Sequence, residues 1–228
     1  IIHIHGWWNL VSVLSCLIAK WHKIPVVLSP RGMLTSYTFG NRNSFSKKII
    51  QKFIGEGLLK YCHIHATSEK EKEDILEILT PKSLTVIPNL VSLSSKDSSK
   101  DYLEFTTGLD KPETLLKLIF LSRIEEKKGL ELLFEALSKI EIKYELTIAG
   151  SGARPYIESL KEKAKILQIE QHINWIGQVS NDDKFSLLAQ YDLMVLISYN
   201  ENFANTVIES LSVGTPVLLS REVGLASY

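Results

Sequence analysis

The sequence predicts an α/β protein of two domains, each a parallel β-sheet wound with helices in the Rossmann-like manner. Short apolar runs typical of buried strands alternate along the chain with segments whose apolar residues recur at helical spacing. Such strict alternation favours parallel sheets with helices on both faces. The 228 residues exceed the usual size of one domain, and a polar stretch rich in Ser, Lys and Asp at 92–101 divides the two alternating halves.

We therefore expect an N-terminal domain at 1–110, which includes the polar connector, and a C-terminal domain at 111–228, with their sheets facing each other across a cleft. The chain opens on a strand without a methionine and closes soon after another strand. We expect both ends to be cut from a longer protein, so that the first domain is incomplete and the second lacks its last elements.

In the first half, strands are expected at 1–5, 26–29, 63–68 and 84–87. A helix follows the first strand, because apolar residues recur there at helical spacing: Leu10, Val13, Leu14, Leu17, Ile18 and Trp21. A second helix is expected at about 47–61. A Ser-x-x-Glu capping box, Ser68 with Glu71, then opens a third helix, which runs to about Leu79.

The second half repeats this pattern. Strands are expected at 118–122, 146–149, 173–176, 193–197 and from 217 onward. Helices are expected at about 130–137, 155–167 and 182–190, with one more between the last two strands. In open parallel sheets, ligands bind outside the carboxyl ends of the strands. The residues that fall at such ends are His5, Arg31, Asn89, Arg123, Gly150, Gly177 and Glu201.

Composition limits the function classes. Lys plus Arg and Asp plus Glu number 26 each, and this balance argues against a broad nucleic-acid surface. No apolar run is long enough to span a membrane. Cys16 and Cys62 are the only cysteines, and we expect two reduced, buried thiols in a cytoplasmic protein. The lysines of 47–52 could face the inner surface of the membrane, or they could be an ordinary solvated face.

The most informative stretch joins the fourth and fifth strands of the second half. Glu201 lies in the loop after the strand, and Glu209 lies about two turns into the following helix, whose apolar side is given by Val207 and Leu211. The free N–H groups at the start of this helix suit a phosphate. Two carboxylates flanking a phosphate site match the layout of a sugar nucleotide. The alternative is two solvated acids at a helix start.

Several motifs together resemble those of the retaining glycosyltransferases of family 4, which share the GT-B fold and a Glu-x7-Glu motif. In the second half these motifs are Leu121-Ser122-Arg123 with Lys128-Gly129, Gly150-Ser151-Gly152, Trp175-Ile176-Gly177, Glu201 with Glu209, and Gly214-Thr215-Pro216. The first half matches less fully, through His3-Ile4-His5-Gly6, Ser29-Pro30-Arg31-Gly32, Thr67-Ser68-Glu69 and Ile87-Pro88-Asn89. Leu90 and Ala204 replace the glycines that are more usual in the family.

The resemblance implies roles for four catalytic residues. Arg123 and Lys128 would hold the donor diphosphate and neutralise the charge that develops as it leaves. Glu201 would bind hydroxyls of the transferred sugar. His5 would contact the sugar or the acceptor, although a histidine that only caps a strand end is an equal alternative.

The resemblance also implies a set of substrate-binding residues. Glu209 would accept hydrogen bonds from the ribose, and Arg31 would either reach the phosphates or an acidic acceptor or brace its own loop. Gly152 would allow close backbone approach. Gln178 and Val179 would border the base, while backbone N–H groups would come from Phe203, Ala204 and Asn205. The sequence shows no Asp-x-Asp metal motif, so we expect no metal and no cofactor.

The function implied is metal-independent transfer of a hexose, with retention, from a UDP- or GDP-sugar to a glycan or lipid-linked acceptor, as in polysaccharide biosynthesis. The activity of this 228-residue chain alone is doubtful if its ends are cut. Two alternatives stay open: a module that binds a nucleotide sugar without catalysis, and a nucleotide-sugar epimerase on the same fold. An epimerase would need further carboxylates in the cleft, and the sequence shows no such cluster.

Overall fold

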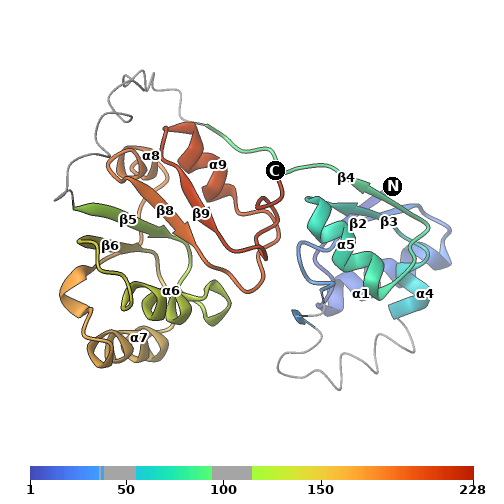
Figure 1. The fold of residues 1–228 in the computed structure, drawn as a ribbon. Helices are drawn as coiled ribbons and strands as arrows, with labels where there is room; N and C mark the ends of the chain where they lie inside the picture. Colours follow the sequence, from blue (N-terminus) through green and yellow to red (C-terminus); the bar gives the residue numbers. More distant parts are fainter. Residues whose placement is uncertain (36, 39–54, 94–114) are drawn as a thin grey trace. The chain divides into compact units, whose positions relative to one another are not determined.

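The chain folds into two compact units (Figure 1). The computed structural model describes residues 1–35, 37–38, 55–93 and 115–228. The first unit comprises residues 1–90 with 200–203 and 227–228, and the second comprises 91–199 with 204–226. The predicted boundary at residue 110 and the polar connector from 94 onward lie outside the described residues, as does most of the helix predicted at 47–61.

The first unit is built on a four-stranded parallel sheet in the order β1-β2-β3-β4. Its strands are β1 (Ile2–His5), β2 (Val26–Ser29), β3 (His63–Ala66) and β4 (Ser83–Val86). Its helices are α1 (Leu10–Trp21), α4 (Glu56–Leu59) and α5 (Glu69–Ile78). The predicted strands and the first and third helices are therefore confirmed, with shifts of one or two residues at their ends.

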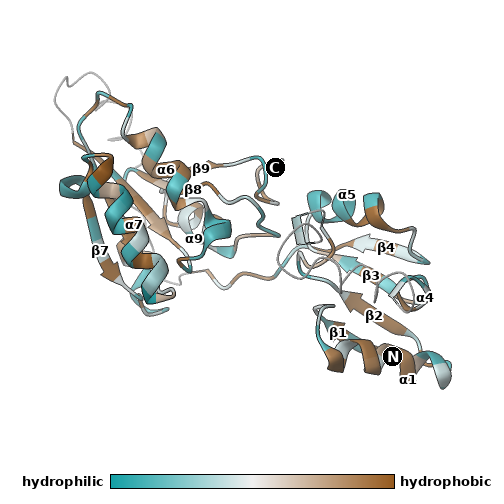
Figure 2. Ribbon diagram, turned by 90° about the horizontal axis from the view of Figure 1, so that it is seen from below, coloured by the Kyte–Doolittle hydropathy of each residue, from teal (hydrophilic) through white to brown (hydrophobic). Residues whose placement is uncertain are grey.

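Helix α1 packs on its small residues rather than on its large ones. Its buried side chains are Ser12, Cys16 and Ala19, which recur at helical spacing and let the helix lie close to the sheet. Most of the apolar residues that predict the helix are exposed instead: Leu10, Leu14, Leu17, Ile18 and Trp21. Figure 2 shows hydrophobic residues along this helix. The periodicity therefore predicts the helix correctly but does not identify its buried face.

The two cysteines are buried and free, as predicted. Their sulfur atoms are 3.8 Å apart, and Cys62 Sγ also donates to the carbonyl of Leu58. The contact with Cys16, together with burial, raises the pKa of the Cys62 thiol far above its ordinary range. The Cys62 thiol is therefore protonated at neutral pH and packs as a small apolar group.

The second unit is built on a five-stranded parallel sheet in the order β7-β6-β5-β8-β9. Its strands are β5 (Leu116–Leu121), β6 (Tyr144–Ala149), β7 (Ile173–Gly177), β8 (Leu193–Leu196) and β9 (Val217–Leu219). Its helices are α6 (Leu130–Leu137), α7 (Arg154–Ile166), α8 (Lys184–Leu188) and α9 (Asn205–Ser212), with short 3-10 turns η3 (Glu126–Lys128) and η4 (Glu170–His172). Successive strands run outward from β5 to β7, and the chain then crosses back to β8.

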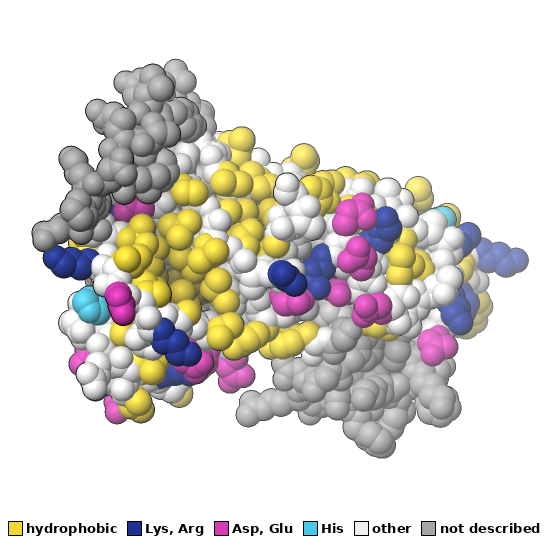
Figure 3. All heavy atoms as spheres, viewed as in Figure 1, with side chains coloured by type: hydrophobic (Ala, Val, Ile, Leu, Met, Phe, Trp, Pro, Cys, Tyr) yellow, Lys and Arg dark blue, Asp and Glu magenta, His cyan; other side chains and the backbone are white. Residues whose placement is uncertain are grey.

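This strand order places helices on both faces of the sheet. Because parallel crossovers are right-handed, α6 and α7 lie on one face and α8 and α9 on the other, as Figure 1 shows. The central strands therefore have hydrophobic side chains on both faces, and Ile119, Phe120 and Ile148 have no exposed surface. Near β8 and β9, hydrophobic side chains also reach the surface (Figure 3). Leu218 of β9 is half exposed.

Phe134 of α6 anchors this helix to the sheet. Its ring is fully buried and meets Trp175 of β7 edge to face, with ring centroids 6.4 Å apart. We expect Phe134→Ala to lower the free energy of unfolding by about 3–5 kcal/mol, because it leaves a cavity under the helix. The matched control is Leu132→Ala on the same helix. Because this leucine is 42% exposed, the substitution should lower the free energy of unfolding by less than about 1 kcal/mol. Urea unfolding followed by circular dichroism measures both, and similar losses would contradict this packing.

Candidate functional site

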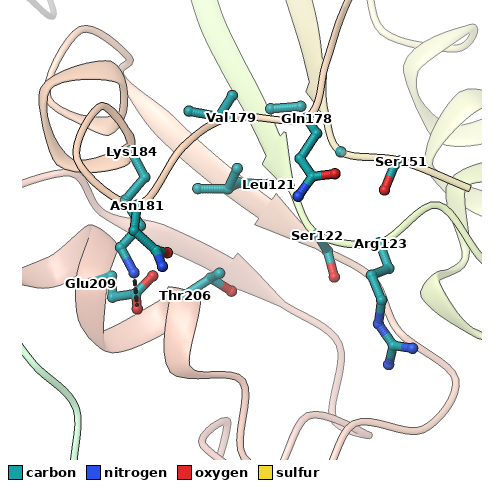
Figure 4. A pocket seen from close by; sticks show the side chains of 12 residues that line it. Leu121, Ser122, Arg123, Ser151, Gln178, Val179, Asn181, Lys184, Thr206 and Glu209 are labelled. Atoms are coloured by element: carbon teal, nitrogen blue, oxygen red, sulfur yellow. Dashed lines mark hydrogen bonds and ion pairs between the residues drawn. The ribbon is translucent and has the colours of Figure 1, made fainter.

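A pocket of about 280 Å³ lies at the carboxyl ends of the second sheet's strands. It is lined by Leu121, Ser122, Arg123, Ala149, Gly150, Ser151, Gln178, Val179, Asn181, Lys184, Thr206 and Glu209. Figure 4 shows Glu209, Lys184 and Asn181 at one end of this pocket and Arg123 at the other. Its volume is near the lower end of roughly 300–1,000 Å³ for small-molecule sites.

The strand order explains why a pocket forms there. The connections from β5 and from β8 leave the sheet in opposite directions, since β5 leads to α6 on one face and β8 leads to α9 on the other. A crevice opens between such diverging connections at a topological switch point, and in open α/β sheets ligands bind in that crevice. Arg123 follows β5 and Thr206 follows β8, so the two sides of the crevice carry a cation and a helix start.

The loops after β5 and β6 approach each other so closely that only glycine fits at two positions, and the loop after β6 is also hydrogen-bonded to the end of β7. The backbone N–H of Ile124 donates to the carbonyl of Ser151, and that of Gly150 donates to the carbonyl of Gly177. A Cβ on Gly150 would lie 1.9 Å from the Ser122 carbonyl oxygen, and one on Gly152 would lie 2.2 Å from that of Ile124. Gly152 thus permits a close backbone approach, and the backbone that approaches it is the loop after β5. Its predicted role in substrate binding stays a prediction.

The loop after β5 carries both cations predicted to bind phosphate, but only one of them is exposed to the pocket. Arg123 lines the pocket, is 67% exposed, and forms a 2.7 Å ion pair with Glu125. Lys128 ends η3, is only 5% exposed, and is not among the lining residues. The loop is attached to the end of β8 by a hydrogen bond from the Tyr199 N–H to the Lys127 carbonyl.

Helix α9 begins at Asn205, after an N-cap residue, Ala204, in the left-handed conformation with φ +63°. Glycine adopts this backbone conformation without strain, which gives a physical reason for the glycine usual at this position in the family. Of the helix, Thr206 and Glu209 line the pocket. The predicted apolar side needs one correction: Val207 is buried, but Leu211 is 52% exposed because the buried face runs through Glu209 and Ser210 instead.

Among the described residues that line the pocket, Glu209 is the one acid, and it is buried. Its side chain is 8% exposed, and its Oε1 atom lies 2.7 Å from Nζ of Lys184, the first residue of α8 (Figure 4). Burial of a carboxylate is costly unless it is paired with a cation or with hydrogen-bond donors. Lys184 supplies that pairing, and its side chain is itself 18% exposed.

Other predicted site residues belong to the first unit. His5 ends β1 and Arg31 follows β2, and the structure brings them together, since Nε of Arg31 donates to Nδ1 of His5 across 3.3 Å. Arg31 has φ +52°, a conformation that costs a non-glycine residue energy and is concentrated at functional sites. Glu201 and Phe203 also fall in this unit, Glu201 half-buried and Phe203 buried.

Glu71 secures the turn that carries Arg31. Its carboxylate is buried and accepts hydrogen bonds from the backbone N–H groups of Gly32 and Thr67, each across 2.7 Å, and from the Thr67 hydroxyl. The predicted capping box is half confirmed, because Ser68 Oγ accepts from the Glu71 N–H. The glutamate side chain, however, connects the ends of β2 and β3.

Sequence reasoning placed Arg123, Gln178, Val179 and Glu209 at the site, and all four line the pocket. It gave no role to the side chains of five further residues that line the pocket: Ser122, Ser151, Asn181, Lys184 and Thr206. Asn181 and Lys184 lie in the polar run 181–184, which is typical of a solvated loop. Their position in the pocket results from the packing of α8 against α9.

Among residues 1–35, 37–38, 55–93 and 115–228, no group of three or more His, Cys, Asp or Glu side chains is arranged to hold a metal ion. Within the same ranges, no helix is long and apolar enough to cross a membrane.

A parallel sheet with a pocket at its switch point is an arrangement in which open α/β proteins bind ligands. Comparison with known proteins gives the family. The family model described as "Glycosyl transferases group 1" matches residues 103–228, more than half of the chain, and the model "Glycosyltransferase Family 4" matches residues 1–95. The chain therefore belongs to the glycosyl transferases group 1 family.

Two curated relatives illustrate the range of the family. The alpha-monoglucosyldiacylglycerol synthase of Streptococcus pneumoniae is 26% identical over 96% of this chain and 51% of its own length. An uncharacterized glycosyltransferase of Methanocaldococcus jannaschii is 29% identical over 72% of this chain and 43% of its own length. The chain thus spans about half the length of the curated relatives it matches.

Solved structures support the GT-B fold. The crystal structure of Anabaena HepE in complex with UDP and glucose matches with a TM-score of 0.72 at 18% identity. The match covers 99% of this chain and 60% of that one. The fold predicted from the sequence is thereby confirmed, with a parallel Rossmann-like sheet in each unit.

Gly129 offers a test of the loop that carries Arg123 and Lys128. It has φ +67°, and an added Cβ would lie 2.0 Å from the Ile197 carbonyl oxygen. Gly177 has a similar φ of +72°, but a Cβ there would meet nothing within 4 Å. Both Gly→Ala changes cost about 1–2 kcal/mol of backbone strain. We expect Gly129→Ala to cost at least about 1–3 kcal/mol more, because the loop must move away from β8. Urea unfolding compares the two variants, and equal losses would show that the close approach does not hold the loop.

Proposed function

We propose that this chain belongs to a glycosyltransferase that takes a hexose from a nucleoside-diphosphate sugar. The observation that carries the proposal is the meeting of Arg123, Thr206 and Glu209 in one pocket at the switch point of the second sheet. These residues come from the loop after β5 and from the helix after β8. Membership of the glycosyl transferases group 1 family supports the same reaction class.

The layout of the pocket suits the parts of a nucleoside diphosphate. We assign the ribose to Glu209, whose carboxylate can accept from hydroxyls, and the diphosphate to Arg123 and the start of α9. Helix N–H groups and a guanidinium are both good partners for phosphate oxygens. Gln178 and Val179 line the same pocket and would border the base. Gly152, Ala204 and Asn205 would contribute through their backbone.

The chemistry we propose needs no metal and no cofactor. Arg123, assisted by Lys128, would stabilise the charge that develops on the departing diphosphate. Glu201 would bind hydroxyls of the transferred sugar, together with the backbone at Phe203. The acceptor would attack on the face from which the diphosphate leaves, and the leaving phosphate would take the acceptor proton, which gives retention. None of these steps needs a carboxylate nucleophile.

The first unit would serve the acceptor. His5 and Arg31 are joined by a hydrogen bond at the carboxyl ends of β1 and β2, and both have polar atoms available for a glycan or an anionic group. A lipid-linked acceptor is consistent with the name of the Streptococcus pneumoniae relative, a glucosyldiacylglycerol synthase. The donor is proposed to be a UDP- or GDP-sugar, since the HepE crystal structure holds UDP and glucose. Such an enzyme would work in the cytoplasm, with peripheral contact to the membrane when its acceptor is a lipid.

Calorimetry with UDP and GDP tests the donor site. We expect one of the two to bind, and we expect Arg123→Ala to weaken that binding by about 10- to 100-fold, the effect of losing a charged hydrogen bond. The control is Lys139→Ala, which removes an exposed cation beyond the end of α6, outside the pocket lining, and should leave the affinity unchanged. If neither nucleotide binds, or if Arg123→Ala binds as tightly as the parent chain, the assignment is wrong.

A turnover assay separates an enzyme from a module that only binds. In the full protein, release of UDP or GDP from its hexose conjugate should depend on an added acceptor. We expect Glu201→Ala to lower that rate by at least about 100-fold, because it removes contacts to the sugar. Binding of the nucleotide without its sugar should persist in this variant. Binding without turnover in the parent protein would favour the non-catalytic alternative.

A further inference from the structure

We propose that Lys184 is a positioning residue that fixes the Glu209 carboxylate for the two ribose hydroxyls and so makes the pocket selective for ribonucleotides. The inference rests on the proposed function, since it concerns the nucleotide of the same pocket. It adds a residue that no sequence motif indicated.

The contact itself is short and largely sheltered. Nζ of Lys184 lies 2.7 Å from Oε1 of Glu209, and the two side chains are 18% and 8% exposed. The residues lie on different helices, 25 positions apart in the sequence, and both line the pocket. Figure 4 shows the pair at the end of the pocket opposite Arg123, which is where a ribose would lie if the diphosphate is at Arg123.

The geometry suits recognition of a diol. An ionised carboxylate only accepts hydrogen bonds, and it offers about four lone-pair positions on its two oxygens. The ammonium group of Lys184 occupies one position on Oε1. The remaining positions are enough for the two donors of a ribose, O2′–H and O3′–H. Hydrogen bonds from hydroxyls to an ionised carboxylate are charge-assisted, and such bonds are roughly twice as strong as neutral ones.

The side chain of Glu209 needs a second contact to stay in place. A glutamate has several rotatable bonds, and holding it in one orientation before the ligand arrives lowers the entropy cost of binding. Lys184 can do this because its own backbone is fixed at the start of α8. The turn before it is closed by Ser180, whose hydroxyl accepts from the Asp183 N–H and donates to the Asp183 carboxylate.

Another lysine–glutamate pair serves as a comparison within the same unit. Lys163 of α7 and Glu135 of α6 also form an ion pair between two helices, but neither lines the pocket. Exposed pairs of this kind contribute little to stability. Lys184 and Glu209, by contrast, sit where a ligand would lie, so loss of Lys184 should change ligand selectivity as well as helix packing.

The test compares UDP with 2′,3′-dideoxy-UDP by calorimetry, using GDP and its dideoxy form if the pocket prefers guanine. The parent chain should prefer the ribonucleotide by about 10- to 100-fold, since the dideoxy form leaves Glu209 without its hydroxyl partners. Lys184→Met should weaken binding of the ribonucleotide by about 10-fold and leave that of the dideoxy form unchanged. The ratio of the two affinities should therefore fall.

Further variants keep the result interpretable. Lys184→Arg retains an ion pair and should retain most of the preference. Lys163→Met removes the comparison pair and should leave both affinities unchanged. If Lys184→Met does not fold, Lys184→Ala replaces it, because alanine also removes the hydrogen bond to Glu209, and the same fall in the ratio is expected.

The outcomes separate this inference from the proposed function. Failure of the parent chain to bind UDP or GDP removes both. Binding in the parent chain with an unchanged ratio in Lys184→Met removes only the present inference. Equal weakening of the two nucleotides also overturns it, because Lys184 would then act on the phosphates or on stability rather than through Glu209.

Discussion

The reversal of strand order between β5 and β8 is the constraint on which the candidate site depends. It sends the chain to opposite faces of the sheet after these two strands, and the crevice between the diverging connections holds the pocket. Hydrogen bonds between the loops after β5, β6 and β7 then fix its rim. Gly150 and Gly152 permit the close approach of the loops after β5 and β6, and Gly129 permits that of the loop after β5 to the end of β8, because a Cβ at each would collide with a carbonyl oxygen. The site is thus a property of the backbone before any functional side chain is considered.

The charged side chains that line the pocket each form an ion pair with a nearby residue. Arg123 forms an ion pair with Glu125 at the exposed end of the pocket, and Lys184 forms one with Glu209 at the sheltered end. The two pairs differ in what a ligand would do to them. A diphosphate would compete with Glu125 for an exposed guanidinium, which costs little, because exposed ion pairs are weak. A ribose would instead add to the Glu209 pair without breaking it. The pocket therefore suits a ligand that has an anionic end and a hydroxylated end.

Each unit carries polar groups at the carboxyl ends of its strands, but the two sets are built differently. In the second unit, loops and helix starts converge on one pocket. In the first unit, a buried acid, Glu71, fastens the turn of Arg31, and Arg31 in turn contacts His5. The left-handed backbone of Arg31 is supported by this fastening. The arrangement in the first unit positions a few exposed polar groups. It is better suited to contact a molecule at the surface than to enclose one.

The sequence alone determined the alternation of strands and helices, the parallel sheets and the residues at the strand ends, because hydrophobic periodicity and glycine positions are local signals. The resemblance of its motifs to family 4 also selected Arg123, Gln178, Val179 and Glu209, which line the pocket. The first three lie just after strand ends, whereas Glu209 lies on α9. The tertiary structure decided which face of α1 is buried, since small residues at Ser12, Cys16 and Ala19 allow a closer approach than the leucines do. It also decided that Lys184 reaches Glu209 and that Leu211 is exposed. Such contacts depend on how two helices pack against each other. The spacing of residues within one helix does not show which residues of the other helix it will contact.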